Sequence, residues 1–227
     1  SLVRLRKAPT AEVVRTLEDN AALASKVKEF DIVFPENFAF TTSFGDTLNG
    51  WMLKPSNFDT TKQYPVLMFV YGGPGSQTVT NSWGGRDFYW YQHLLSKGYI
   101  VVSIDNRGTG ARGAKFRQST YAQLGKLETL DQIEGAKYLA TQSFIDKNRI
   151  GIWGWSFGGY MTSLCMTIGA DYFKTGIAVA PVTTWRYYDT IYTERFLKRP
   201  SDNPSGYDDN SPINHASKLK GKLLLVH

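Results

Sequence analysis

The distribution of apolar and polar positions changes near residue 64. Before it, the apolar-rich segments Phe38–Phe44 and Leu48–Leu53 flank the turn-forming pair Gly45-Asp46, which predicts a β-hairpin. After it, nearly continuous apolar runs alternate with longer segments of helical period. A run of this kind is typical of a strand that is buried on both faces, as parallel sheets require.

The alternation predicts a doubly wound α/β fold with a mainly parallel sheet, because strands that alternate with helices build parallel units. The predicted strands after the hairpin are Pro65–Tyr71, Tyr99–Asp105, Arg149–Trp155, Thr175–Ala180 and Lys222–His227. The predicted helices are Ala21 to about Lys28, Asp87–Lys97, Leu127–Thr141 and Phe157–Gly169. In such sheets the reactive groups gather at the carboxyl ends of the strands.

Two regions of different character are expected. Residues 1–19 are charged and lack a clear amphipathic period, which indicates a connector or the remnant of an upstream domain. Residues 20–227 are expected to form one α/β domain. The last apolar run ends at His227 with no helix after it, so we expect this domain to be incomplete at its C-terminus.

Composition narrows the possible partners. The formal net charge is +6, but Lys and Arg are scattered, which favours a solvated surface over a nucleic-acid site. No apolar run is long enough to span a bilayer. Cys165 is the single cysteine, so no disulfide can form within the chain, and this lone thiol does not fix the compartment.

The segment Gly154-Trp155-Ser156-Phe157-Gly158 fits the G-x-S-x-G nucleophile elbow. It lies between a predicted strand and a predicted helix, where small residues permit a sharp turn that lifts the serine above the sheet. The Phe157 N–H would then face the space in which an oxyanion forms. We therefore expect Ser156 to be the nucleophile of a serine hydrolase; the alternative is a glycine-rich turn with an incidental serine.

A nucleophilic serine needs a base and an orienting acid, which follow it in the order acid, then histidine, in this type of fold. His215 is expected to be a surface or capping residue, His227 to support a loop, and His93 to be a packing or surface residue. The acidic residues Asp189, Asp202, Asp208 and Asp209 all precede the strand whose end usually carries the acid. We therefore expect both partners of Ser156 to lie outside this chain.

The segment Gly151–Tyr160, with the sequence GIWGWSFGGY, resembles the serine region of the prolyl oligopeptidase family, most of all its dipeptidyl-peptidase IV branch of bacterial type. Other segments resemble that branch in the same order along nearly the whole chain: Leu17–Asn20, Val70–Pro74, Asp105–Gly110 and Trp185–Arg195. The resemblance implies the α/β-hydrolase fold and a catalytic-domain fragment.

The same resemblance implies roles for individual residues. Ser156 would be the nucleophile, and the Tyr71 hydroxyl would bind the oxyanion beside the backbone N–H of Phe157. A pocket for a proline ring would be lined by Val182, Trp185, Tyr188 and Tyr192. From the residues alone, Tyr71 could instead pack under a loop, and the pocket residues could be ordinary core. The branch often has tyrosine where this chain has Phe157, so any hydroxyl contact there is lost.

The implied activity is release of an N-terminal dipeptide after proline, less well after alanine, through an acyl-enzyme on Ser156, without metal or organic cofactor. Implied partners are peptides with proline at the second position, an upstream β-propeller of the same protein and a second copy in a homodimer. The implied location is outside the cytoplasm, in the bacterial periplasm or envelope. Alternatives are a prolyl tripeptidyl-peptidase, an acylaminoacyl-peptidase, a silent binding protein of the same fold and, less favoured, a lipase or esterase.

Overall fold

A computed structural model describes residues 3–82, 85 and 87–227 and separates the chain into two units, 1–34 and 35–227. In the first unit, strands β1 (Val3–Lys7) and β2 (Glu12–Glu18) form an antiparallel hairpin, followed by helix α1 (Ala21–Val27). Every β2 side chain is exposed and α1 buries none. This unit extends to residue 34. The domain boundary expected at 19/20 stays a prediction, and residues 1 and 2 of the expected connector lie outside the described part.

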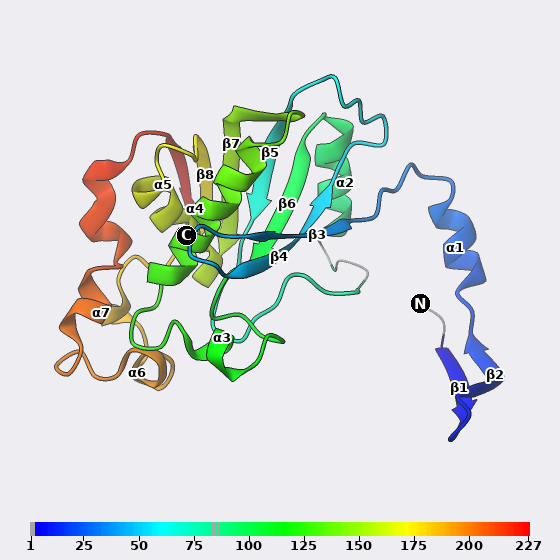
Figure 1. Cartoon of the computed structure of the whole chain (residues 1–227), viewed down its shortest axis with the longest axis horizontal. Coiled ribbons are helices and arrows are strands. Elements are labelled where there is room, and N and C mark those ends of the chain that lie inside the picture. The colour runs from blue at the N-terminus through cyan, green and yellow to red at the C-terminus, as the bar shows by residue number, and fades with distance from the viewer. Residues whose placement is uncertain (1–2, 83–84, 86) are drawn as a thin grey trace. The chain divides into compact units, whose positions relative to one another are not determined.

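The second unit is built on a sheet of seven described strands in the order β3-β4-β6-β5-β7-β8-β9 (Figure 1). These strands are β3 (Glu36–Thr41), β4 (Thr47–Leu53), β5 (Tyr64–Phe69), β6 (Ile100–Asp105), β7 (Ile145–Trp155), β8 (Thr175–Val179) and β9 (Lys222–Val226). The pairs β3–β4 and β4–β6 are antiparallel, and all later pairs are parallel. The predicted hairpin and mainly parallel sheet are confirmed.

Three long helices lie where the periodicity placed them: α2 (Phe88–Ser96), α4 (Lys126–Ala140) and α5 (Phe157–Ile168). Shorter elements were not predicted: α3 (Ala114–Gln118), η1 (Trp185–Tyr187), α6 (Thr190–Leu197), α7 (Pro204–Asp208) and η2 (Pro212–Lys218). Three of them, η1, α6 and α7, are capped by side chains, as where Asp189 accepts a hydrogen bond from the Tyr192 N–H at 2.8 Å. Such local caps stabilise helices that a periodicity search overlooks.

Helices cover both faces of the sheet. Met68 and Phe69 are successive residues of β5, so their side chains point to opposite faces. The Phe69 ring lies 6.3 Å from that of Tyr91 on α2. On the other face, a Cβ at Gly135 of α4 would lie 3.7 Å from Met68 Cε. The sheet is therefore doubly wound, as predicted, and every residue of β6 is buried.

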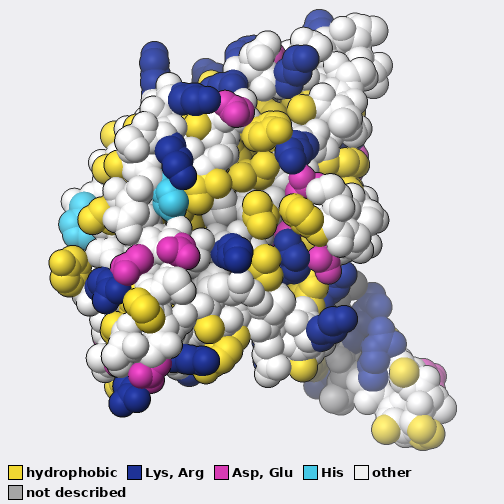
Figure 2. All heavy atoms as spheres, turned by 60° about the vertical axis from the view of Figure 1, so that its left-hand side comes forward, with side chains coloured by type: hydrophobic (Ala, Val, Ile, Leu, Met, Phe, Trp, Pro, Cys, Tyr) yellow, Lys and Arg dark blue, Asp and Glu magenta, His cyan; other side chains and the backbone are white. Residues whose placement is uncertain are grey.

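The surface shows no dense basic field on the face drawn in Figure 2, where Lys and Arg side chains are scattered among acidic and apolar ones. No helix within the described residues is long and apolar enough to cross a membrane. Strand β9 lies at one edge of the sheet and leaves Leu224 and Leu225 exposed by 56% and 58%.

A buried ion pair fastens the loop after β6 to α4. Arg107 donates through Nε and Nη2 to Asp131, with Nη2–Oδ1 at 2.6 Å, and its backbone N–H donates to Asp131 Oδ2 at 2.7 Å. The Asp131 side chain is fully buried, and Arg107 also contacts Asp46 at 3.1 Å. A carboxylate buried in this way is stable only because several donors surround it.

A second buried carboxyl lies one turn earlier on α4. Glu128 Oε2 accepts a hydrogen bond from the Gly125 N–H at 2.9 Å, which caps the helix. The side chain is fully buried, and desolvation raises the pKa of Glu128 to about 8. Glu128 therefore stays protonated in the folded protein up to about pH 8, whereas in the unfolded chain it loses its proton near pH 4.5.

Asp131→Ala is expected to lower the free energy of unfolding by about 3–5 kcal/mol, because it leaves the Arg107 charge without its main partner. The exposed pair Arg199–Asp202 gives the control, and Asp202→Ala should change stability little. Urea unfolding curves of the three proteins measure the difference. Equal midpoints for the two variants would contradict the importance of the buried pair.

Glu128→Gln is expected to become more stable relative to the unmodified protein as pH rises from about 4.5 to about 8. Over this window unfolding releases the Glu128 proton, so rising pH destabilises the unmodified protein, whereas glutamine keeps the cap and has no proton to lose. Melting temperatures from pH 5 to pH 9 test this. In the control, Glu134→Gln, the carboxyl has a lowered pKa through Lys137, and the curve should stay parallel to that of the unmodified protein.

Candidate active site

The turn between β7 and α5 holds Ser156 in a strained conformation. Its φ of 58° and ψ of −115° lie outside the regions that most residues adopt, at a cost of about 1–3 kcal/mol. The Ser156 N–H donates to the Val179 carbonyl of β8 at 2.9 Å, and its own carbonyl accepts from the Tyr160 N–H at 3.0 Å. These bonds hold the half-buried serine at the carboxyl end of β7.

Glycines permit this turn because the neighbouring backbone leaves no room for a Cβ. At either Gly154 or Gly158, a Cβ would collide with the Val70 carbonyl oxygen, which follows β5. A Cβ at Gly159 would lie 2.6 Å from the Val179 carbonyl oxygen of β8. The elbow is thus wedged between the ends of β5 and β8, which is the geometry expected from the sequence; the nucleophilic role of Ser156 stays a prediction.

Tyr71 stands at the carboxyl end of the neighbouring strand. The preceding residue, Val70, donates its N–H to the Trp153 carbonyl at 3.0 Å, which fixes the end of β5 beside β7. The Tyr71 ring centroid lies 6.1 Å from that of Phe157, and the residue is 37% exposed. Partial burial, assisted by Tyr188, raises the pKa of the Tyr71 phenol, so the hydroxyl keeps its proton and can donate at neutral pH.

The loop that carries Tyr71 is held by hydrogen bonds from amide side chains. Asn106 Nδ2 donates to the Gly72 carbonyl at 3.0 Å, and Gln132 Nε2 donates to Asn106 Oδ1 at 3.0 Å. Gly72 has a φ of +74°, which glycine adopts without cost. Sequence reasoning gave Asn106 no role, although a polar residue at the carboxyl end of a buried strand is a usable signal.

An aromatic cluster extends from the elbow over η1 and α6. The Trp185 ring lies 5.7 Å from Phe157, 5.6 Å from Tyr188 and 5.7 Å from Tyr192, the last nearly parallel. Trp185 is 2% exposed and belongs to the core, whereas Tyr188 is 45% exposed and offers ring surface to solvent. Val182, just after β8, is half-buried beside this core. All four expected pocket residues thus follow β8, and their role in binding stays a prediction.

Two further rings belong to the cluster and were missed. Tyr160 lies 5.2 Å from Phe157 and 5.1 Å from Trp185, and its hydroxyl lies 2.9 Å from the carbonyls of Leu124 and Asn210. Phe196 lies 5.0 Å from Tyr192. It follows Tyr192 by four residues on α6, so the helical spacing alone could have identified it.

Several of the histidines and aspartates that follow Ser156 are engaged elsewhere. His215 Nε2 lies 2.6 Å from the Asp209 carbonyl and its Nδ1 lies 3.1 Å from Lys218 Nζ, as expected of a capping residue. Asp208 pairs with Arg186. No hydrogen bond joins Ser156 to a histidine within the described residues. His227 is exposed at the end of β9, and His93 is exposed on α2.

Comparison with known proteins identifies the family of the chain. Residues 86–227 match the profile of the prolyl oligopeptidase family. The chain is 43% identical to a probable dipeptidyl-aminopeptidase B of Paracoccidioides brasiliensis, over 96% of the chain and 24% of that protein. It is also 43% identical to mouse dipeptidyl peptidase 8, over 87% of the chain and 22% of that protein. The chain therefore spans about a quarter of the length of these curated relatives.

Solved structures show the same relationship. The crystal structure of Porphyromonas gingivalis dipeptidyl peptidase 4 superposes with a TM-score of 0.92 at 45% identity, covering 99% of this chain and 31% of that one. A putative dipeptidyl aminopeptidase IV of Bacteroides ovatus gives 0.90 at 36% identity over the same shares. The expected α/β-hydrolase fold is thereby confirmed, and the chain belongs to the prolyl oligopeptidase family of serine peptidases.

Proposed function

We propose that the protein carrying this chain is a serine dipeptidyl peptidase that releases N-terminal Xaa-Pro, and less readily Xaa-Ala, from peptides. The observation that carries the proposal is the direct continuity of the Ser156 elbow with a cluster of aromatic rings that is partly open to solvent. The names of the relatives, all dipeptidyl peptidases or dipeptidyl-aminopeptidases, support the same activity. No metal or organic cofactor is needed for this chemistry.

In the proposed reaction, Ser156 Oγ attacks the scissile carbonyl carbon and the carbonyl oxygen becomes an oxyanion. The Phe157 N–H at the start of α5 and the Tyr71 hydroxyl donate to that oxygen. Collapse of the intermediate releases the shortened peptide and leaves the dipeptide as an ester on Ser156, which water then hydrolyses. The proton transfers need a histidine and an acid, which we place outside this chain.

The preference for proline rests on ring geometry. Proline presents a compact, rigid apolar ring, and flat aromatic faces contact such a ring over a large area. Tyr188 and Tyr192 meet edge to face at 5.7 Å, and Trp185 stacks on Tyr192 from the core side. With Val182, these rings would form a rigid pocket next to the serine. A longer unbranched side chain would lose more conformational entropy in this pocket than proline does.

We further propose that the protein contains a β-propeller upstream of this chain, forms a homodimer and works outside the cytoplasm of a bacterium, in the periplasm or envelope. The first unit supports additional upstream structure, because Val14 and Leu17 of β2 are each 54% exposed and need apolar neighbours. Size-exclusion chromatography and cell fractionation of the full-length protein test the dimer and the location.

The experiment that tests the activity is chromophore release by the full-length protein from Gly-Pro, amino-blocked Gly-Pro and Ala-Ala-Pro anilides. We expect rapid cleavage of free Gly-Pro and none of the blocked form, and loss of all turnover in a folded Ser156→Ala variant. Preference for Ala-Ala-Pro would favour a prolyl tripeptidyl-peptidase, and cleavage of the blocked form an acylaminoacyl-peptidase. If the folded protein cleaves none of these anilides, a binding role is favoured. If it cleaves only ester substrates, a lipase or esterase is favoured.

Tyr71→Phe is expected to lower kcat by about 10²- to 10³-fold, since one oxyanion donor contributes roughly 3–4 kcal/mol to transition-state stabilisation. KM should change little because the ground-state carbonyl gains little from this donor. Tyr187→Phe is a matched control, since Tyr187 is 90% exposed. An increase in KM with unchanged kcat would place Tyr71 in substrate binding instead.

A further inference from the structure

The loop that follows β5 has little rigidity of its own. It contains Gly72, Gly73 and Gly75 within four residues, and Gly72 and Gly75 have φ values of +74° and +72°. Glycine loses more conformational freedom on folding than any other residue, so a loop of this kind keeps one conformation only where other groups hold it. Tyr71 immediately precedes these glycines. The position of its hydroxyl therefore depends on the groups that hold the loop.

The loop folds back onto the ring of Tyr71. A Cβ at Gly73 would lie 2.8 Å from Tyr71 Cε1 and 3.2 Å from Phe157 Cγ, so the Gly73 backbone packs directly against both rings. The Gly73 carbonyl accepts hydrogen bonds from the N–H of Ser76 at 3.1 Å and from its hydroxyl at 2.6 Å. The turn from Gly73 to Ser76 thus limits the movement of the Tyr71 ring, and displacement of this turn would release it.

The far end of the loop is bound by Asp105, the last residue of β6. Asp105 Oδ1 accepts from the Thr78 N–H at 2.8 Å and from the Thr78 hydroxyl at 2.7 Å. Asp105 Oδ2 accepts from the Val79 N–H at 3.0 Å, and the residue is 6% exposed. Hydrogen bonds to an ionised carboxylate are shorter and stronger than those between neutral groups. One buried side chain therefore fixes two successive residues of the loop.

Ser103 connects this anchor to the strand that leads into Tyr71. The Ser103 hydroxyl lies 2.8 Å from that of Thr78 and donates to the Phe69 carbonyl at 2.9 Å. Phe69 is the last residue of β5, two residues before Tyr71. Ser103 and Asp105 are two residues apart on β6, so their side chains share one face of the sheet and together hold both ends of the loop.

We propose that Asp105 is a positioning residue, which acts through this loop to keep the Tyr71 hydroxyl where the oxyanion forms, an inference that rests on the proposed peptidase function. The role needs no contact between Asp105 and the substrate. A donor stabilises an oxyanion only at about 2.7–3.1 Å, and a misplacement of about 1 Å can lower a rate about 100-fold. Loss of the Asp105 bonds therefore slows turnover only while Tyr71 has a hydroxyl to donate.

The test compares Asp105→Asn, Tyr71→Phe and the double variant of the full-length protein on Gly-Pro anilide. Asparagine has one acceptor oxygen in place of two, so the loop loses at least one backbone bond. We expect Asp105→Asn to lower kcat about ten- to a hundredfold with little change in KM. In the Tyr71→Phe background the same substitution should lower kcat by less than about twofold, because both changes remove one interaction.

Asp59→Asn is the matched control. Asp59, between β4 and β5, likewise accepts hydrogen bonds from a threonine N–H and hydroxyl, those of Thr61, at 2.9 and 2.7 Å. Its kcat and KM should not change. An equal loss of kcat from Asp105→Asn with and without the Tyr71 hydroxyl would overturn the proposal, and so would an unchanged kcat. If Asp105→Asn does not fold, Thr78→Val takes its place in the same comparison, because valine keeps the shape of threonine and removes the hydroxyl that Asp105 binds.

Hydrogen exchange keeps this inference separate from the proposed activity. If the unmodified protein cleaves no anilide, the peptidase proposal fails, and amide exchange of the full-length protein, followed by mass spectrometry, examines the loop directly. Faster exchange of residues 72–79 in Asp105→Asn but not in Asp59→Asn, with the other strands unchanged, supports Asp105 as the anchor of the loop. Equal exchange of residues 72–79 in the unmodified protein and Asp105→Asn would overturn it.

Discussion

The close approach of backbone at the elbow is the constraint on which this site depends. Val70 on one side and Val179 on the other leave no room for side chains at Gly154, Gly158 and Gly159. That approach forces the chain to reverse from β7 into α5 within one residue and exposes a serine at the rim of the sheet. The groups proposed to bind the oxyanion and the proline ring then follow, because β5 and β8 end beside β7.

Helix α4 stabilises the loops at the carboxyl ends of the strands with polar side chains rather than apolar ones. Asp131 binds the loop after β6, Gln132 supports the amide of Asn106, and Glu128 caps the helix next to Tyr160. Each fastens a loop whose backbone groups would otherwise lack partners. Buried polar groups of this kind favour one arrangement of loops over others, at a cost in desolvation that an apolar helix would avoid.

The long elements could be predicted because each carries a dense pattern of its own. Strand β5 and helices α4 and α5 are specified by nearly unbroken apolar or periodic positions, and the elbow by five consecutive residues. The segment that follows β8 has no such pattern, since α6 is short and depends on the Asp189 cap. The hairpin of residues 3–18 was missed because its apolar positions are few and the alternation of β1, Val3-Arg4-Leu5-Arg6, spans only four residues.

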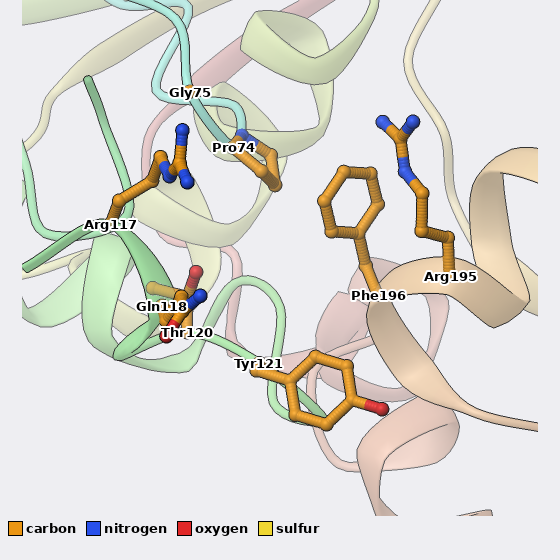
Figure 3. A pocket seen from close by; sticks show the side chains of 8 residues that line it. All are labelled: Pro74, Gly75, Arg117, Gln118, Thr120, Tyr121, Arg195 and Phe196. Carbon is orange, nitrogen blue, oxygen red and sulfur yellow. The ribbon is translucent and has the colours of Figure 1, made fainter. Parts of the chain in front are cut away.

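The site could be predicted only as far as its parts are local in sequence. Ser156 and Phe157 belong to one motif, and the proposed pocket residues lie within eleven positions of one another. The hollow beside Phe196 (Figure 3) is lined by three segments that are distant in sequence and has no sequence signature, so only the folded chain reveals it. The support of Tyr71 by Asn106 and Gln132 likewise depends on contacts across more than twenty residues.

The hydrogen bond from the Ser156 N–H to Val179 has a kinetic consequence. It places the amide of Ser156 in the ladder between β7 and β8, two strands that are each paired on both sides, and amides in such ladders exchange with solvent when the sheet opens cooperatively. The half-buried serine side chain is therefore reachable by a substrate while its backbone N–H is protected within the sheet. Partial unfolding at the edges of the sheet would leave the elbow intact, and its loss would coincide with global unfolding.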